Sequence, residues 1–251
     1  MSHPSLSSLL TPARVVQKNL ATALVMDDSS DWSIYLKTQL SLFAEGTQSI
    51  LGTSPKSRPH SPYGDDWDLL WLGHCGSSVN RNNQRRFVVE NDHTVPLPEN
   101  REVSSGESIE MAQEGFDDRT RVVYEADGGH CSYAYALSKR GAEKVIQWNN
   151  KLREFTATDA GLAKMCKAGK GFKCLSVFPA LVGTHKARPN SEAQEEGDGA
   201  HEPGRTMNIL HSQRWNIERA LKKVPLGDGR DWRQWEEESV VEGTPRIRRM
   251  E

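Results

Sequence analysis

Two short apolar runs, each ending abruptly in polar residues, constrain the fold of this chain more than any other feature. ALVM at 23–26 stops at an acidic turn, and WDLLWLG at 67–73 stops at a histidine and a cysteine. Runs of this length between polar turns are typical of buried strands. Because strand-like runs alternate along the chain with segments whose apolar residues have helical spacing, the pattern predicts an α/β fold with a mostly parallel sheet flanked by helices. We expect the two strands to lie side by side, with the acidic turn and His74 near the same edge.

The rest of the chain continues this alternation. Ser138 offers an N-cap to a helix that follows a run of small and aromatic residues. Cys174 begins another short run, which Pro179 closes. The remaining expectations are strands at 132–137 and 174–178, a paired ribbon at 87–89 and 121–124 beside a polar insertion at 91–118, and helices at 158–166 and 213–224.

Composition excludes some partners. The formal net charge of the 251 residues is -2, so no overall basic field exists to attract nucleic acid. No run approaches the roughly 18 apolar residues of a membrane span, and the first residues lack the pattern of a signal peptide. Residues 188–205 are rich in Glu, Gly, Pro and Asn and nearly devoid of large apolar side chains, which predicts a disordered segment.

The four cysteines, Cys75, Cys131, Cys166 and Cys174, include no CxxC pair, which leaves little support for a zinc ribbon or a redox site. Buried thiols and disulfides both remain open. Cys166 and Cys174 enclose a short loop whose closure would stabilise the fold by about 2 to 3 kcal/mol, provided that the protein enters the secretory pathway. Adjacent residues of a strand face opposite ways, so His74 and Cys75 cannot form a base and nucleophile; core packing or a disulfide explains Cys75 better.

The acidic turn after the first strand is the leading candidate for chemistry. Asp27, Asp28 and Asp31 lie where the carboxyl end of a strand meets a loop, and clustered carboxylates are a natural place for a divalent cation. Such a cation can bridge protein carboxylates and a diphosphate leaving group. The alternative is structural, since Asp and Ser before a helix are ordinary N-caps and suit the positive end of its dipole.

Four segments in a fixed order carry a family resemblance. They are NLATALVMDDSSDW, YGDDWDLLWLGHCG, SYAYALSKRGAEKVI, and Asp159 with LAKMC and CLSVFPALVGTH. Over residues 13–185 the chain resembles the fungal members of the family 25 glycosyltransferases, the lipopolysaccharide-type galactosyltransferase family. The resemblance implies a GT-A fold, which is a Rossmann-like α/β domain, and transfer of a sugar such as galactose from a UDP-sugar to a glycan or glycoprotein acceptor with Mn²⁺ or Mg²⁺.

The resemblance also assigns residues. Asp27 and Asp28 would bind the metal and the donor, and Asp31 would add a metal ligand. The family motif Glu-Asp-Asp corresponds here to Asp27, Asp28 and Ser29, so one family carboxylate is replaced by a neutral hydroxyl, which is a weaker metal ligand. Together with the absence of the family's nucleotide-binding part before residue 13, and of another cluster that could hold the diphosphate, this replacement leads us to expect little or no transferase activity.

Two further assignments each have a structural alternative. His185 would be a late metal ligand, or else a histidine of a surface loop. Asp159 would be the general base that takes the acceptor's proton, or else a partner for the positive end of its helix. Trp67 and Trp71 could stack on a sugar, but alternating strand positions favour the core.

The resemblance divides the chain into a leader at 1–12, a glycosyltransferase-like domain at 13–187, a disordered linker at 188–205, and a helix with a charged tail at 206–251. The family's nucleotide-binding part would precede residue 13, so we expect an amino-terminally truncated domain. Three functions remain open: an active metal-dependent transferase, a noncatalytic remnant that binds without turnover, and an unrelated interaction domain. The resemblance suggests the secretory pathway; without it, the missing signal favours the cytoplasm.

Overall fold

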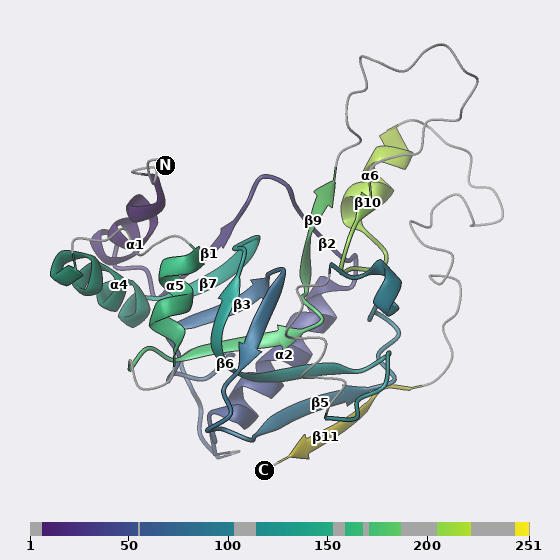
Figure 1. Ribbon diagram of the computed structural model, residues 1–251, viewed down its shortest axis with the longest axis horizontal. Coiled ribbons are helices and arrows are strands. Elements are labelled where there is room, and N and C mark those ends of the chain that lie inside the picture. The colour runs from purple at the N-terminus through teal and green to yellow at the C-terminus, as the bar shows by residue number, and fades with distance from the viewer. Residues whose placement is uncertain are drawn as a thin grey trace.

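A mixed sheet with helices on both faces forms the body of the protein (Figure 1). The structure, a computed structural model, describes residues 7–54, 56–102, 114–152, 159–167, 171–186, 205–221 and 244–250. The large sheet comprises β1 (Thr22–Met26), β3 (Leu69–Gly73), β4 (Gly76–Val79), β5 (Arg86–Glu90), β6 (Arg121–His130), β7 (Ala134–Ser138), β8 (Cys174–Phe178) and β11 (Arg246–Met250). A small sheet comprises β2 (Ser30–Trp32), β9 (Val182–Lys186) and β10 (Arg205–Thr206). The helices are α1 (Ser7–Gln17), α2 (Leu36–Ile50), α4 (Lys139–Leu152), α5 (Asp159–Cys166) and α6 (Gln213–Leu221), with a 3-10 turn at Pro98–Asn100.

The strand order β1-β7-β3-β8-β6-β5-β11, with β4 paired to β6, confirms a mixed α/β fold but corrects the expected strand directions. Among the described strands of the large sheet, only β3 and β8 pair in parallel; the other pairs are antiparallel. The expectation of a mostly parallel sheet was therefore wrong. The difference arises from β7, which lies between β1 and β3 and is antiparallel to both. β1 and β3 are therefore not side by side.

The expected common edge is nevertheless confirmed. Met26 and Gly73 both pair with Ala134 of β7, one from each side. Since β1 and β3 are each antiparallel to β7, they run parallel to one another. Their carboxyl ends therefore bring the acidic turn and His74 to one edge of the sheet.

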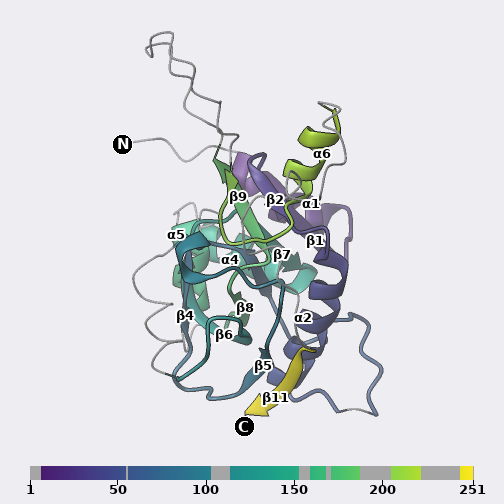
Figure 2. The ribbon, with the colours of Figure 1, turned by 90° about the vertical axis from the view of Figure 1, so that its right-hand side faces the viewer.

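Alternation along the strands builds two cores. On one face, α2 packs Phe43 and Ile50 against side chains such as Leu70 and Val123. On the other face, α1, α4 and α5 pack against Trp71 and neighbouring side chains. Figure 2 shows the sheet between α2 on one side and α4 with α5 on the other. Successive residues of a strand point to opposite faces of the sheet, so strands that are apolar throughout are buried on both faces.

Several local predictions are confirmed. The Ser138 hydroxyl accepts a hydrogen bond from the Gly141 amide at 3.0 Å and so caps α4. β5 and β6 form the expected ribbon, in which Phe87 pairs with Val123. Trp67 and Trp71 are 2% and 0% exposed, which places both in the core.

Two disulfides join the described elements. Cys166 at the end of α5 is bonded to Cys174 at the start of β8, as the short loop between them predicts. Cys75 is bonded to Cys131, which ties the end of β3 to the segment before β7. This pairing confirms the structural interpretation of Cys75.

The carboxyl-terminal part contributes to both sheets. β10 pairs with β9, and β11 pairs with β5. The sequence pattern indicated neither strand, because β11 consists largely of arginine and lies at an exposed edge. The segment expected to be disordered, 188–205, lies outside the described residues except for Arg205. Among the helices of the described chain, none is both long and apolar enough to cross a membrane.

Candidate functional site

The acidic turn lies directly beyond β1, and its first two carboxylates are exposed. Asp27 and Asp28 both face solvent. Asp27 Oδ1 accepts hydrogen bonds from the Ser29 hydroxyl at 2.6 Å and from the Ser29 amide at 2.9 Å. These two bonds stabilise the ionised carboxylate and lower the pKa of Asp27. The turn therefore presents two adjacent negative charges at the carboxyl edge of the sheet.

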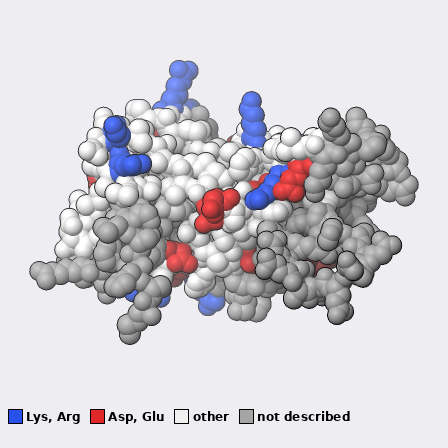
Figure 3. Space-filling model, turned by 90° about the horizontal axis from the view of Figure 1, so that it is seen from above, with Lys and Arg blue, Asp and Glu red and all other residues white. Residues whose placement is uncertain are grey.

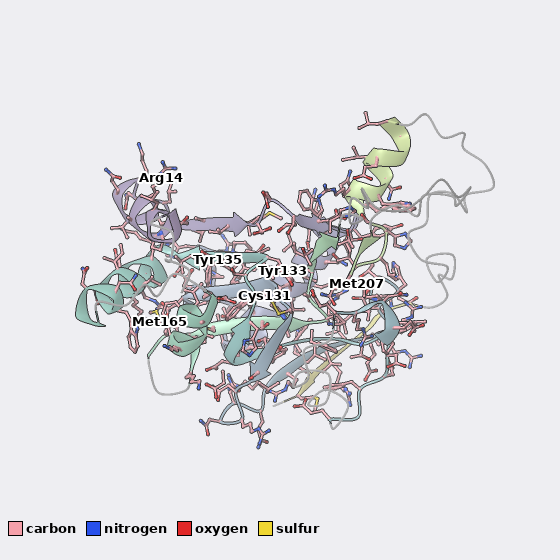
Figure 4. The ribbon with its side chains drawn as sticks, turned by 45° about the horizontal axis from the view of Figure 1, so that its top comes forward. Arg14, Cys131, Tyr133, Tyr135, Met165 and Met207 are labelled. Atoms are coloured by element: carbon pink, nitrogen blue, oxygen red, sulfur yellow. A yellow bond between two sulfur atoms is a disulfide. The ribbon has the colours of Figure 1, made fainter. Side chains whose placement is uncertain are left out.

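Tyr133 and Glu102 extend this acidic surface. The Tyr133 carbonyl accepts from the Asp27 amide at 2.9 Å, and the Tyr133 hydroxyl donates to Glu102 Oε2 at 3.0 Å. Partial burial raises the pKa of Tyr133 well above its ordinary value, and the hydrogen bond to Glu102 and the charges of Glu102 and Asp27 raise it further. Tyr133 is thus a neutral hydroxyl among carboxylates. We call Asp27, Asp28, Glu102 and Tyr133 the acidic edge; Figure 4 labels Tyr133 and, beside it, Cys131.

Asp31 has a different environment. Its side chain is 2% exposed. Oδ1 accepts from the amides of Trp32 at 2.8 Å and Arg214 at 3.0 Å. Oδ2 accepts from the hydroxyls of Thr206, at 2.7 Å, and Ser212. Both oxygens are engaged at the amino terminus of α6, so Asp31 caps a helix, as the structural alternative proposed, although the helix is α6 rather than α2.

His185 belongs to the same hydrogen-bond chain. Because the Thr206 hydroxyl donates its hydrogen to Asp31, it must accept from His185 Nδ1, which lies 3.0 Å away. Burial lowers the pKa of His185, and the positive charge of Arg214 lowers it further. His185 is therefore a neutral imidazole that is 8% exposed, rather than the histidine of a surface loop.

The four residues expected to bind metal are neighbours, but they do not converge. Ser29 connects the exposed pair, Asp27 and Asp28, to the strand that carries His185. Its hydroxyl lies 3.0 Å from the Thr184 hydroxyl, and its carbonyl accepts from the His185 amide at 2.8 Å. Successive strand residues point to opposite faces. Thr184 thus faces the exposed turn, while His185 faces Thr206 and buried Asp31. In the described part of the chain, no group of three or more His, Cys, Asp or Glu side chains is placed to hold a metal ion.

Asp159 is held at the amino terminus of α5. Its Oδ1 accepts from the Ala160 amide at 2.7 Å, and its Oδ2 accepts from the Cys131 amide at 3.2 Å. These bonds fix the start of α5 against the Cys75–Cys131 disulfide and support the structural alternative for Asp159. Its role as a general base stays a prediction.

His74 also has a structural environment. Nε2 lies 3.0 Å from the Val177 carbonyl and 3.2 Å from the Ser176 hydroxyl. Complete burial lowers the pKa of His74 to about 4, so the ring is neutral at physiological pH. Its neighbour Cys75 is in a disulfide, which confirms that the two do not form a nucleophile and base.

Other buried charges belong to internal ion pairs. Asp68 accepts from Arg140 at 2.9 Å and from Lys144 at 2.7 Å, and Arg121 donates to Asp92 at 2.7 Å. In each of these three ion pairs the buried carboxylate is paired with a basic side chain of the protein, which is the ordinary condition for buried charge. The acidic edge is therefore the better candidate for a binding site. Sequence reasoning missed Tyr133 and Glu102, because neither lies in the acidic turn; the alternation of SYAYAL was the one signal that pointed toward Tyr133.

Comparison with known proteins adds no assignment: no family model, no curated protein and no solved structure matches this chain.

Proposed function

We propose that this chain is a glycosyltransferase-like protein whose acidic edge binds a sugar, and that it transfers little or no sugar from a UDP-sugar such as UDP-galactose. One observation carries the proposal: Asp27 and Asp28 remain exposed beyond β1, whereas Asp31 is buried as a helix cap. Carboxylates accept hydrogen bonds from hydroxyl groups, and a glycan acceptor is rich in hydroxyls. The family resemblance supports a sugar as the ligand.

The residues present do not form a complete site for the Mn²⁺ or Mg²⁺ that the resemblance implies. Asp27 and Asp28 can supply oxygen ligands, but Ser29 offers a neutral hydroxyl that is already bonded to Asp27. Asp31 has no free oxygen, and His185 faces away from the turn. Since two adjacent carboxylates bind a divalent cation weakly, we derive no catalytic step through a metal.

Sugar binding therefore rests on the acidic edge itself. Ser29 bonds only Oδ1 of exposed Asp27, so this serine does not engage the other carboxylate oxygen, Oδ2. The Tyr133 hydroxyl, kept neutral by partial burial and by the surrounding carboxylates, holds Glu102 in place. The hydroxyl groups of a sugar bound across this edge would donate to the Asp27 carboxylate on one side and to the Glu102 carboxylate on the other.

An active transferase is the second candidate. The position of Asp27 and Asp28 at the carboxyl end of a strand favours it, since ligands of α/β sheets bind where strands end in loops. In that reading Asp159 would take the acceptor's proton. Two disulfides in the described chain support passage through an oxidising compartment, and we propose the secretory pathway.

Binding and turnover separate the candidates. We expect saturation-transfer NMR to detect galactose-containing glycans on the full chain, and a combined Asp27→Asn and Asp28→Asn variant to weaken binding about tenfold, as expected for losing charge-assisted hydrogen bonds. Glu45→Gln removes an exposed carboxylate of α2 and serves as the matched control. Release of UDP from UDP-galactose with Mn²⁺ should stay near background. Robust sugar transfer that Asp28→Ala abolishes would establish the active enzyme instead, and no glycan binding at all would remove the proposal.

A further inference from the structure

β1 ends the large sheet, and no strand of the described residues lies beside one side of its backbone. The sheet order begins at β1, which among the described strands pairs only with β7. The Lys139 amide donates to the Ala21 carbonyl, and the Asp27 amide donates to the Tyr133 carbonyl. Odd-numbered residues of this segment therefore bond to β7. Because the pattern alternates in an antiparallel pair, the N–H and C=O groups of Thr22, Leu24 and Met26 point outward.

An open cavity adjoins this edge on the α2 face of the sheet. Its volume is about 480 Å³. Leu24, which is 57% exposed, forms part of its wall. The other apolar lining residues include Leu40, Trp67, Leu70, Leu72 and Ala136. An exposed leucine over an apolar cavity marks a surface that would gain stability from being covered.

Charge is distributed unevenly along the edge. Asp27 and Asp28 follow the carboxyl end of β1, whereas exposed Lys18 precedes its amino end and Lys139 lies beside Ala21. Figure 3 shows the molecule from above, with red acidic side chains near the middle and blue basic side chains both beside them and toward the left, where Figure 1 places α1. A ligand with the opposite polarity would match both ends.

These observations favour a polypeptide over a lipid or a small molecule. Outward N–H and C=O groups recur every second residue, roughly 6.8 Å apart along an extended strand. Another backbone carries donors and acceptors at that same repeat. Strand addition at a sheet edge combines such main-chain bonds with pockets for alternate side chains.

We propose that β1 and the adjoining cavity bind an extended segment of another polypeptide, added as a strand antiparallel to β1. Residues directly opposite in such a pair point to the same face, so the side chain opposite Leu24 covers the cavity. The segment carries apolar residues at alternate positions, a basic residue at its amino end near Asp28, and an acidic residue at its carboxyl end near Lys18. The main-chain pairing with β1 does not depend on sugar binding, although the basic residue of the segment would share Asp28 with the acidic edge.

A designed peptide tests the proposal on the full chain. The probe is the end-blocked sequence Lys-Thr-Val-Thr-Leu-Thr-Val-Thr-Glu, with its leucine opposite Leu24, and binding is followed by fluorescence anisotropy. N-methylation of the peptide's leucine removes an amide that faces β1 and should weaken binding about tenfold, since one main-chain hydrogen bond is lost and the methyl group intrudes. N-methylation of the threonine that follows the leucine alters an amide that faces solvent, so it should leave affinity unchanged.

Amide exchange on the protein supplies a second readout. Peptide binding should slow exchange of the Thr22, Leu24 and Met26 amides and leave those of Ala23 and Val25 unchanged, because the latter already bond to β7. Leu24→Lys should abolish binding without altering the far-ultraviolet circular dichroism spectrum. Absence of binding, or equal weakening by both N-methylated peptides, would overturn strand addition. Slow exchange of the same three amides without peptide, together with a dimer in analytical ultracentrifugation, would show that a second copy covers the edge and would overturn the proposal of another polypeptide.

Discussion

Asp28 and Asp31 lie three positions apart, yet they occupy opposite environments. Asp28 is exposed in the turn after β1, whereas Asp31 is 2% exposed and accepts four hydrogen bonds beneath α6. The difference arises from β2, because pairing of Asp31 with Gly183 turns this side chain into the protein. A Cβ on Gly183 would lie 2.1 Å from the Met207 carbonyl oxygen, so this close packing requires glycine. The comparison shows that a run of acidic residues need not act as one site.

Substitution by alanine gives the largest expected contrast. Asp31→Ala leaves the buried hydroxyls of Thr206 and Ser212 and the Arg214 amide without their acceptor, and we expect a loss of about 3 to 5 kcal/mol in the free energy of unfolding. Asp28→Ala should change it by less than about 0.5 kcal/mol, as is usual for an exposed side chain. Urea denaturation measures both.

Limited proteolysis tests whether the loss of stability in Asp31→Ala comes from loosening of α6. Asp31→Ala should make the region of α6 more susceptible to cleavage, since the carboxylate joins β2 to the start of that helix. Asp31→Asn, which keeps one acceptor oxygen, should show an intermediate effect. Equal stabilities of Asp28→Ala and Asp31→Ala would contradict the distinction between the two aspartates.

A pH series extends the comparison to the buried histidine at the same edge. The pKa of His74 is lowered from 6.5 to about 4 in the folded protein because complete burial disfavours the charged ring. The unfolded chain therefore binds a proton at a higher pH than the folded chain does. The stability is fully present above pH 6.5 and is lost as pH falls toward 4, by up to about 3 kcal/mol for this residue.

Denaturation of the wild type and of His74→Gln at pH 7 and pH 4.5 tests this. The wild type should lose more stability between the two pH values than the variant does, because glutamine does not titrate. Comparing the change in the free energy of unfolding between the two pH values removes any pH-independent destabilisation caused by the substitution. Parallel slopes would show that His74 is protonated or exposed in the folded state.

Strand positions were predictable because apolar runs bounded by turns are local signals. The sequence pattern located β1, β3 and β8 to within about two residues. Strand order was not predictable in the same way, since SYAYAL has the composition of a strand but nothing in it specifies insertion between β1 and β3. The loop length between Cys166 and Cys174 indicated one disulfide, whereas the Cys75–Cys131 bond spans 56 residues and depends on the tertiary fold.

The candidate site was predictable only in its local part. Asp27 and Asp28 follow a strand directly, so their exposure at a sheet edge follows from the pattern. The role of Asp31 depends on Thr206 and Ser212, which lie more than 170 residues away along the chain. Glu102 reaches Tyr133 across 31 residues, so no local spacing joins them.

The smallest expected effect concerns Ser29, which lies between the exposed and the buried aspartates. Its hydroxyl and amide stabilise the charged form of Asp27, which lowers the pKa of that carboxyl. Ser29→Asp replaces a donor with a third carboxylate, so repulsion should raise the pKa of Asp27, and a divalent cation would relieve it. We expect Mn²⁺ affinity, measured by calorimetry, to rise about fivefold. Ser29→Ala removes the hydroxyl without adding charge, so it should raise the pKa of Asp27 toward its ordinary value but should not improve Mn²⁺ binding. UDP-galactose turnover should remain near background in both variants, because Asp31 and His185 still face away from the turn. Unchanged Mn²⁺ affinity in Ser29→Asp would mean that the turn does not bind cations through Asp27, whereas a large gain in turnover would show that residue 29 alone had limited an otherwise complete catalytic site.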